Sequence, residues 1–399
     1  MFNQEIALTP SPHAEKAIET AFAHGKAIVK FISPNDVGET GSHQCGYLLP
    51  KNAWKAFTEH PPQKVKTESN PREKVRILWQ NGRETNSVIT WYGRKTRSEY
   101  RLTRFGKDFP YLTKDNIGSM LVLIPVGERF FHAFVLDTDA DFEAISSALG
   151  VDTAKSWALF DSSAGDKVES ENDCINRHFQ NFLGQHASFP KSITLAEAAQ
   201  TAFLNCVKDI VKWSSDDKLS KLMHFEYELF KMLERKVCQS EITRLFKDVD
   251  DFVGTASSIV NRRKSRAGRS LEHHVGFLLK QAGVPFESQP DIDGRPDIVI
   301  PSSKAYCDSS YPDEKLIVLG LKTTCKDRWR QVLNEGKRVK SKHLLTLQHG
   351  ITEAQMNQME ASSVSLIVPS SSHKYFPKSK MGHLLSVENF ISKVKEIHK

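Results

Sequence analysis

The sequence contains no long apolar run. In its 399 residues, no stretch approaches the roughly 20 consecutive apolar residues that a membrane-spanning helix requires. The first residues, Met1 to Glu5, also lack the basic and then apolar profile of a secretory signal peptide. We therefore expect a cytoplasmic protein.

Cysteine is scarce, and the six that are present are scattered along the chain. No CxxC pair occurs, so the spacing indicates neither a zinc site nor a disulfide framework, and six reduced thiols are expected. The six are Cys45, Cys174, Cys206, Cys238, Cys307 and Cys325.

Neither sign of charge dominates the composition. Lys and Arg number 55 against 48 for Asp and Glu, which leaves a net charge of +7. This mild excess permits a polyanionic partner without requiring one. An apolar fraction of 39% excludes a mostly disordered or collagen-like chain. The Walker A, HExxH, GxSxG and Rossmann glycine motifs are all missing, so those enzyme classes are not indicated.

The first 160 residues are expected to form a small β barrel or sandwich. Six runs are rich in β-branched or aromatic residues and bounded by Gly, Pro, Asn or Asp, as strands are. The expected strands are 27–32, 45–49, 75–79, 87–92, 120–126 and 130–136. Helices are predicted at about 13–24 and 140–149, where apolar residues recur with helical spacing.

The remainder predicts a linker and a second domain. Residues 161–193 begin with a polar, small-residue run and are interpreted as the linker. Residues 194–399 are expected to form an α/β domain with a mixed sheet. Its expected helices are 195–213, 218–238, 241–260, 270–282, 327–339, 353–361 and 387–397, and its expected strands are 297–300, 316–322, 343–347 and 364–368.

A carboxylate–lysine–carboxylate pattern in the second domain indicates nuclease chemistry. Asp297 opens one predicted strand, Lys322 ends the next, and Glu335 follows on a predicted helix. Carboxylate oxygens can hold Mg²⁺, which activates water, while a lysine can orient that water or stabilise the phosphate. Nucleases of this kind usually place an acid two residues before the lysine, where this chain has Gly320. Glu335 must then replace that acid, and we assign the metal to Asp297 and Glu335.

Basic clusters flank this pattern. Five cations and no acid occur from Arg262 to Arg269, and more cations follow Lys322 as far as Arg338. A solvated charged face is the commoner fate of such runs. Their position beside the candidate metal site favours a surface that follows DNA phosphates.

The amino-terminal domain carries its own DNA-reading composition. Residues 91–107 combine six cations with aromatic residues and a single acid, and 35–44 form a polar loop punctuated by glycine. Cations suit phosphates, and Asn, Gln, Glu and Arg suit base edges, although an ordinary polar loop has a similar composition.

Several strings resemble the EcoRII-type restriction endonucleases. They are Val260 to Glu272, Lys322 to Gln331, Val368 to Ser371 and the loop Asn35 to Gly41 with His43 to Gly46. The resemblance spans nearly the whole chain. It implies a bacterial homodimer, paired with a DNA methyltransferase, that cleaves double-stranded DNA using Mg²⁺. For the amino-terminal domain it implies a pseudobarrel that binds effector DNA and inhibits the catalytic domain. For the carboxy-terminal domain it implies the restriction-endonuclease fold.

The resemblance assigns site residues in both domains. In the catalytic domain, the family's active-site residues match Asp297, Lys322 and Glu335. The resemblance also implies catalytic roles for Glu272 and Tyr306. It implies that a CC:GG core is read by Lys326, Asp327 and Arg328. For effector DNA it gives Asn35, Asp36, His43, Gln44, Arg94, Lys95, Arg97, Glu99, Tyr100, Arg101 and Arg104.

Two departures from the family pattern leave specificity open. Relatives that flip a central base carry an Arg four residues before an aromatic, where this chain has Met223 before Tyr227. Both CC(A/T)GG with a flipped base and a continuous CCGG core therefore stay open. In the effector arm, Tyr100 stands where the family has a lysine.

Two other functions are compatible with the same residues. One is a sequence-specific DNA-binding regulator whose nuclease domain is inactive. The other is a repair nuclease that cuts by DNA structure and not by sequence.

Overall fold

The computed structural model describes residues 9–40, 45–58, 62, 70–94, 97–163 and 173–398. The chain divides into two compact units. Unit 1 contains residues 1–165 with 348–356 and 374–381, and unit 2 contains 166–347, 357–373 and 382–399. Among the described helices, none combines the length and the apolar character needed to cross a membrane.

Unit 1 is built on an eight-stranded sheet with strand order β2-β5-β4-β3-β7-β6-β1-β8. Neighbouring strands are antiparallel except β3 and β7, which are parallel. Its strands are β1 (Lys26–Phe31), β2 (Tyr47–Pro50), β3 (Arg72–Trp79), β4 (Glu84–Tyr92), β5 (Glu99–Thr103), β6 (Met120–Gly127), β7 (Phe130–Leu136) and β8 (Trp157–Asp161). The helices α1 (Pro12–His24) and α2 (Asp139–Leu149) pack on one face.

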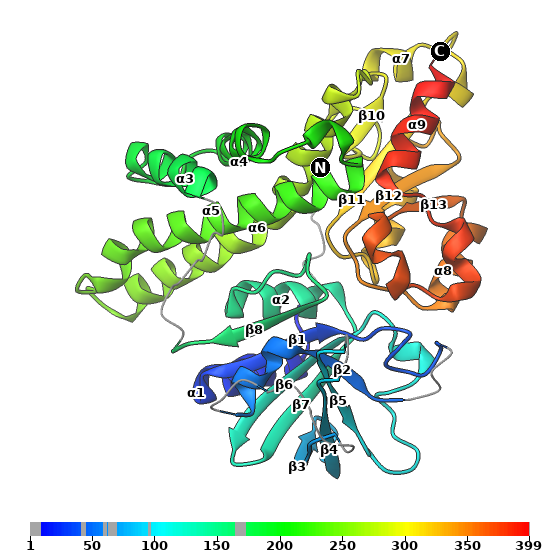
Figure 1. Ribbon diagram of the computed structural model, residues 1–399. Helices are drawn as coiled ribbons and strands as arrows, with labels where there is room; N and C mark the ends of the chain where they lie inside the picture. The colour runs from blue at the N-terminus through cyan, green and yellow to red at the C-terminus, as the bar shows by residue number, and fades with distance from the viewer. Residues whose placement is uncertain are drawn as a thin grey trace. The chain divides into compact units, whose positions relative to one another are not determined.

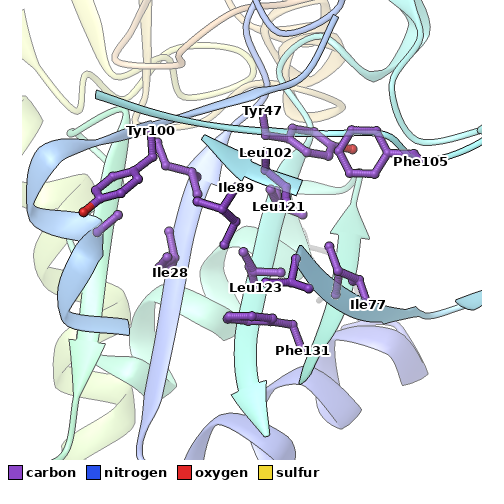
Figure 2. Close-up of a cluster of buried hydrophobic side chains, with 14 of the residues drawn as sticks. Ile28, Tyr47, Ile77, Ile89, Tyr100, Leu102, Phe105, Leu121, Leu123 and Phe131 are labelled. Carbon is purple, nitrogen blue, oxygen red and sulfur yellow. The ribbon is translucent and has the colours of Figure 1, made fainter. Parts of the chain in front are cut away.

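Alternating side chains give this sheet two apolar cores. In β1, Ile28 faces one cluster, while Val29 and Phe31 face the other, as the two-residue period of a strand requires. The first cluster fills the concave side of the sheet and contains Tyr47, Tyr100 and other residues labelled in Figure 2. The second cluster lies beneath α1 and α2. The expected β architecture of this domain is therefore confirmed, as a half-open barrel.

Unit 2 begins with four helices. They are α3 (Asp173–Gln185), α4 (Ser192–Cys206), α5 (Ser215–Thr243) and α6 (Val249–Gln281). Figure 1 shows α5 and α6 as a long pair lying side by side. The two helices expected at 241–260 and 270–282 are in fact the single helix α6, which continues through Gly268 because a helix accepts an isolated glycine at a modest cost.

A five-stranded mixed sheet completes unit 2, with strand order β13-β12-β11-β10-β9. The expected mixed α/β sheet is confirmed, since β11, β12 and β13 are parallel and β10 is antiparallel to β11. The elements are β9 (Glu287–Ser288), β10 (Ile298–Ile300), α7 (Ser303–Cys307), β11 (Ile317–Lys322), β12 (Lys342–Thr346), β13 (Val364–Ile367) and α9 (Val387–Ile397). Helix α8 (Glu353–Ala361) begins in the part of the chain grouped with unit 1 and ends in unit 2.

Two expectations about this unit are wrong. The helix predicted at 327–339 is only a 3-10 segment, Arg328–Asn334. The expectation that all six cysteines are reduced also fails, because Cys174 and Cys206 form a disulfide. These cysteines are 32 residues apart in sequence, and only the packing of α3 against α4 brings them together.

Candidate active site

The pairing of β10 with β11 brings Asp297 and Lys322 together. Ile298 lies opposite Leu319 in antiparallel register, so Asp297, one residue earlier, reaches the carboxyl end of β11. Its Oδ2 accepts hydrogen bonds from the Leu321 amide at 2.6 Å and from Lys322 Nζ at 3.2 Å. Strand pairing and an ion pair thus hold this carboxylate beside the lysine.

Glu335 occupies the space beside Gly320. An ideal Cβ built on Gly320 would lie 3.5 Å from Glu335 Oε2 and only 2.6 Å from a methyl of Val332. The glycine therefore leaves room for Val332 of the 3-10 segment, and the Glu335 carboxylate lies at van der Waals distance from the position that a Cβ would take. Glu335 lies just past that segment in extended backbone, and not on a helix as the sequence suggested.

The Glu335 carboxyl group is buried and electrostatically perturbed. Its residue is only 8% exposed, and Oε2 has no hydrogen-bond partner among the described residues. Burial raises the pKa of Glu335 to about 7; Lys322 and Lys342 oppose this shift, and the Asp297 charge adds to it. A buried oxygen without a partner is costly, and a cation at this position would satisfy it.

Glu272 joins the site from α6 through a glutamine. Gln289 Nε2 donates to Glu272 Oε2 at 3.0 Å and to Asp297 Oδ1 at 3.4 Å. The Gln289 backbone is also fixed, because its amide donates to the Asp297 carbonyl at 2.9 Å and its φ is +49°. Burial and the Asp297 charge raise the pKa of Glu272. The bridging amide therefore holds two acids together that would otherwise repel each other.

Tyr306 contacts the segment that follows Glu335. Its hydroxyl donates to Asp293 Oδ1 at 2.5 Å and accepts from the Arg338 amide at 3.0 Å. Asp293 Oδ2 in turn accepts from the Lys337 amide at 2.6 Å. Burial raises the pKa of Tyr306 to about 12, so this phenol stays protonated at neutral pH. In this arrangement Tyr306 fixes the backbone next to Glu335.

The expected base readers begin four residues after Lys322. Lys326 is buried, whereas Asp327 and Arg328 are half-buried at the start of the 3-10 segment. Nearby, Arg330 lies over the Trp329 ring at 4.7 Å and donates to Gln358 Oε1.

The basic cluster on α6 has partners within the helix pair. Arg262 bonds to Glu241 at 2.8 Å, and Arg263 bonds to Glu234 at 2.8 Å, both across to α5. Arg266 lies 5.0 Å from the ring of Tyr227. These three cations stabilise the packing of α5 on α6, so the cluster is not simply a phosphate-binding surface.

The amino-terminal loop is organised around Asp36, which is fully buried. Its carboxylate accepts from Lys30 Nζ at 2.6 Å, from the amide and hydroxyl of Ser33, and from the Leu48 amide at 2.6 Å. Asp36 therefore holds the loop and does not present its carboxylate to a ligand. Asn35 Oδ1 accepts from the Thr40 hydroxyl, while the predicted sites His43 and Gln44 lie outside the described residues.

The predicted effector arm has buried and exposed members. Tyr100 packs in the apolar core, 4.6 Å from Trp91 between ring centroids, and Arg101 is also buried. The same arm contains the half-buried Arg94 and Glu99 and the exposed Arg97. Lys95 lies outside the described residues. Arg104 is exposed on left-handed backbone and lines a pocket together with Lys74, Arg76, Glu128 and Arg129.

Two polar residues of the catalytic unit escaped the sequence analysis. Gln289 directly follows the two-residue strand β9, in a bend where no periodicity marks it. Asp293 precedes Gly294 in a turn, and the Asp-Gly pair was the one available signal. Each contacts an expected site residue, Asp297 or Tyr306.

Known proteins resemble this chain over nearly all of its length. The family described as "EcoRII C terminal" matches residues 230–391, and "Restriction endonuclease EcoRII, N-terminal" matches 23–161. The type II restriction enzyme EcoRII of Escherichia coli is 31% identical over 408 residues, covering 95% of each chain. The type II restriction enzyme SsoII of Shigella sonnei is 25% identical over 154 residues, which cover 36% of this chain and 49% of that enzyme.

Solved structures of restriction endonucleases are more distant. Ecl18kI, metal-depleted and in complex with uncleaved, modified DNA, has a TM-score of 0.45 at 18% identity, covering 56% of this chain and 83% of that one. The PspGI–substrate DNA complex has a TM-score of 0.45 at 13% identity, covering 52% and 93%. The family assignment depends on the sequence relatives, and because the likeness to EcoRII extends over nearly the whole of both chains, this chain belongs to the EcoRII family of type II restriction endonucleases.

Proposed function

We propose that the protein makes Mg²⁺-dependent double-strand breaks at a short DNA site with a CC:GG core. The observation that carries this proposal is the placement of Glu335. Its Oε2 has no hydrogen-bond partner among the described residues and lies beside Gly320, 3.5 Å from the position of an ideal Cβ there, next to the Asp297–Lys322 ion pair. A carboxylate supplied from a later segment thus replaces the acid missing at Gly320.

The donor set suits a hard divalent cation. Asp297 and Glu335 offer carboxylate oxygens, which Mg²⁺ prefers, and Glu335 Oε2 has no competing donor among the described residues. When bound, Mg²⁺ offsets the negative charge that develops on the phosphate and makes water a better nucleophile.

The side chains around the metal position have separate tasks. Lys322 holds Asp297 through the 3.2 Å contact, and its ammonium can orient the attacking water or stabilise a non-bridging phosphate oxygen. Glu272, linked to Asp297 through Gln289, supplies additional negative charge facing the cation. Tyr306 positions the backbone after Glu335 through Asp293 and Arg338.

Sequence reading is assigned to Lys326, Asp327 and Arg328. Cations suit the O6 and N7 acceptors of guanine, and a carboxylate suits the N4 donor of cytosine. Because Lys326 is buried in this structure, its base contact requires local rearrangement on DNA. We propose that two copies of the chain form a dimer and that each copy reads one half of the DNA site. We also propose that a paired DNA methyltransferase modifies this site in the host DNA and so protects it from cleavage.

We propose that the amino-terminal domain, predicted at 1–160, binds a second DNA copy as an effector and inhibits the catalytic domain, predicted at 194–399. The predicted linker 161–193 contains helix α3, which belongs to unit 2. Arg104 and Lys74 line one pocket and offer cations for phosphates, whereas their neighbours Arg76 and Arg129 are paired with Glu84 and Glu73. For an effector to activate, it must bind the active arrangement better than the resting one. Wild type should cut single-site DNA slowly and be stimulated by a cognate oligonucleotide, and Arg104→Ala should weaken that stimulation.

The nuclease proposal is tested with a plasmid digest in Mg²⁺ and in EDTA. Wild type should linearise a plasmid only in Mg²⁺. Lys322→Ala should bind cognate DNA normally yet cut at least 100-fold more slowly, roughly the contribution expected from an acid–base group. Equal cutting in EDTA would refute the metal requirement. Retained site-specific binding without any cleavage would identify a DNA-binding regulator with an inactive nuclease domain.

A further inference from the structure

Two helices of unit 2 bring two cysteines and a histidine together, far along the chain from the carboxylate site. Cys174 lies in the first turn of α3, His178 one helical turn later on the same face, and Cys206 at the end of α4. The two sulfur atoms and a ring nitrogen of His178 all lie within 4.8 Å of one another. All three residues are half-buried.

Helix packing holds the three positions in place. Along α3, Ile175, Phe179 and Leu183 are buried at a spacing of four residues. Phe179 of α3 and Phe203 of α4 both pack against Phe225 of α5, at ring-centroid distances of 6.2 and 6.3 Å. The Cα atoms of Cys174 and Cys206 are 5.6 Å apart. The backbone is therefore already arranged so that a small side-chain rotation can separate the two sulfur atoms.

The chemistry of the trio is that of a zinc site. Thiolate sulfur and imidazole nitrogen are the ligands that Zn²⁺ prefers, and sites with three protein ligands leave a fourth position for water. Two sulfur atoms alone do not complete a zinc site, and His178 supplies a third ligand atom within 4.8 Å of both.

We propose that Cys174, His178 and Cys206 bind one Zn²⁺ when the disulfide is reduced. A dithiol reductant opens the Cys174–Cys206 bond, giving two protein thiols and the oxidised reductant. Binding of Zn²⁺ then releases the two thiol protons, and the sulfur atoms bind as thiolates beside neutral His178. Disulfide and zinc forms use the same sulfur atoms and exclude each other. In either form α3 is fastened to α4.

Cobalt provides the direct test on the full-length protein. After reduction with dithiothreitol and its removal without oxygen, Co²⁺ should give a near-ultraviolet thiolate-to-cobalt charge-transfer band. A site made of Asp297 and Glu335 has no sulfur and cannot give this band. Zn²⁺ should abolish the band at one equivalent per chain, whereas Mg²⁺ should leave it unchanged. The oxidised protein should give no band.

Variants assign the ligands. Cys174→Ser and Cys206→Ser should lose the band, and His178→Ala should bind Zn²⁺ about tenfold more weakly or worse, measured by competition with a chromophoric chelator. Cys45→Ser is the matched control, because Cys45 is an exposed free cysteine of unit 1, and it should behave as wild type. If the serine variants fail to fold, the wild-type cobalt spectrum still decides. The proposal is wrong if reduced wild type gives no thiolate band, or if His178→Ala retains wild-type zinc affinity.

Discussion

Replacing Glu335 by glutamine should stabilise the metal-free protein at alkaline pH while it removes activity. Burial raises the pKa of Glu335 from 4.5 to about 7, so the folded protein holds this proton more tightly than the unfolded chain does. The stability that this proton provides is complete below pH 4.5 and is lost as the pH rises through about 7. At about 1.4 kcal/mol per pKa unit, the loss is about 3 kcal/mol. In Glu335→Gln the side chain at this position is neutral at every pH, so this variant should not lose that stability as the pH rises.

The assay is urea unfolding in EDTA at pH 4 and at pH 8. The free energy of unfolding of Glu335→Gln should match that of wild type at pH 4 and exceed it by about 3 kcal/mol at pH 8. Glu314→Gln, at an exposed carboxylate, serves as the control and should match wild type at both pH values. Mg²⁺ at pH 8 should stabilise wild type more than Glu335→Gln, because it binds the charged carboxylate. A difference that is the same at pH 4 and pH 8 would refute the reasoning.

Three further substitutions test other parts of the structure. Gln289→Ala should raise the Mg²⁺ concentration for half-maximal cleavage roughly tenfold, since it frees Glu272 and Asp297 to move apart, and an unchanged Mg²⁺ requirement would contradict the bridging role. Arg328→Ala should lose roughly 1–3 kcal/mol of discrimination between cognate and single-mismatch duplexes in competition binding. An equal loss of affinity for both duplexes would show that Arg328 contacts a phosphate and not a base. Asp36→Ala should destabilise unit 1 by roughly 3–5 kcal/mol in chemical unfolding, because it leaves the buried Lys30 ammonium unpaired, and unchanged unfolding would show that the ion pair is dispensable.

The positions of Asp297 and Lys322 could be predicted from the sequence, because both residues end or begin apolar runs that read as strands. Glu335 was predicted as a site residue from its spacing after Lys322 and from the family resemblance, but its local structure was not predicted. A helix was expected after Asp327, and the chain instead forms a 3-10 segment that ends just before Glu335. Tertiary packing decided this, since Trp329 and Val332 are buried and Gly320 gives Val332 room.

Partners distant in sequence explain most of what was missed. The run from Arg262 to Arg269 reads as a free basic surface, because Glu234 and Glu241 lie more than 20 residues earlier on α5. The sequence predicts that Asp36 binds DNA, because its burial and its contact with Lys30 are not visible in the local sequence. Strand β5 was not predicted because the polar residues Glu99 and Arg101 occur in it, and its pairing with β2 and β4 stabilises it. Strand β8 is apolar except for Asp161 and has no alternation to mark it, and it pairs with β1. Helix α3 was hidden in the segment expected to be a linker.

The central claim is that Asp297, Lys322 and Glu335 cleave DNA at one short sequence with Mg²⁺. Sequencing the termini produced on a plasmid of known sequence tests it most directly. Wild type in Mg²⁺ should give discrete termini that all flank the same CC:GG-core site, and Glu335→Ala should give none while still binding that site. Termini scattered without a common sequence, or wild-type cleavage by Glu335→Ala, would contradict the account.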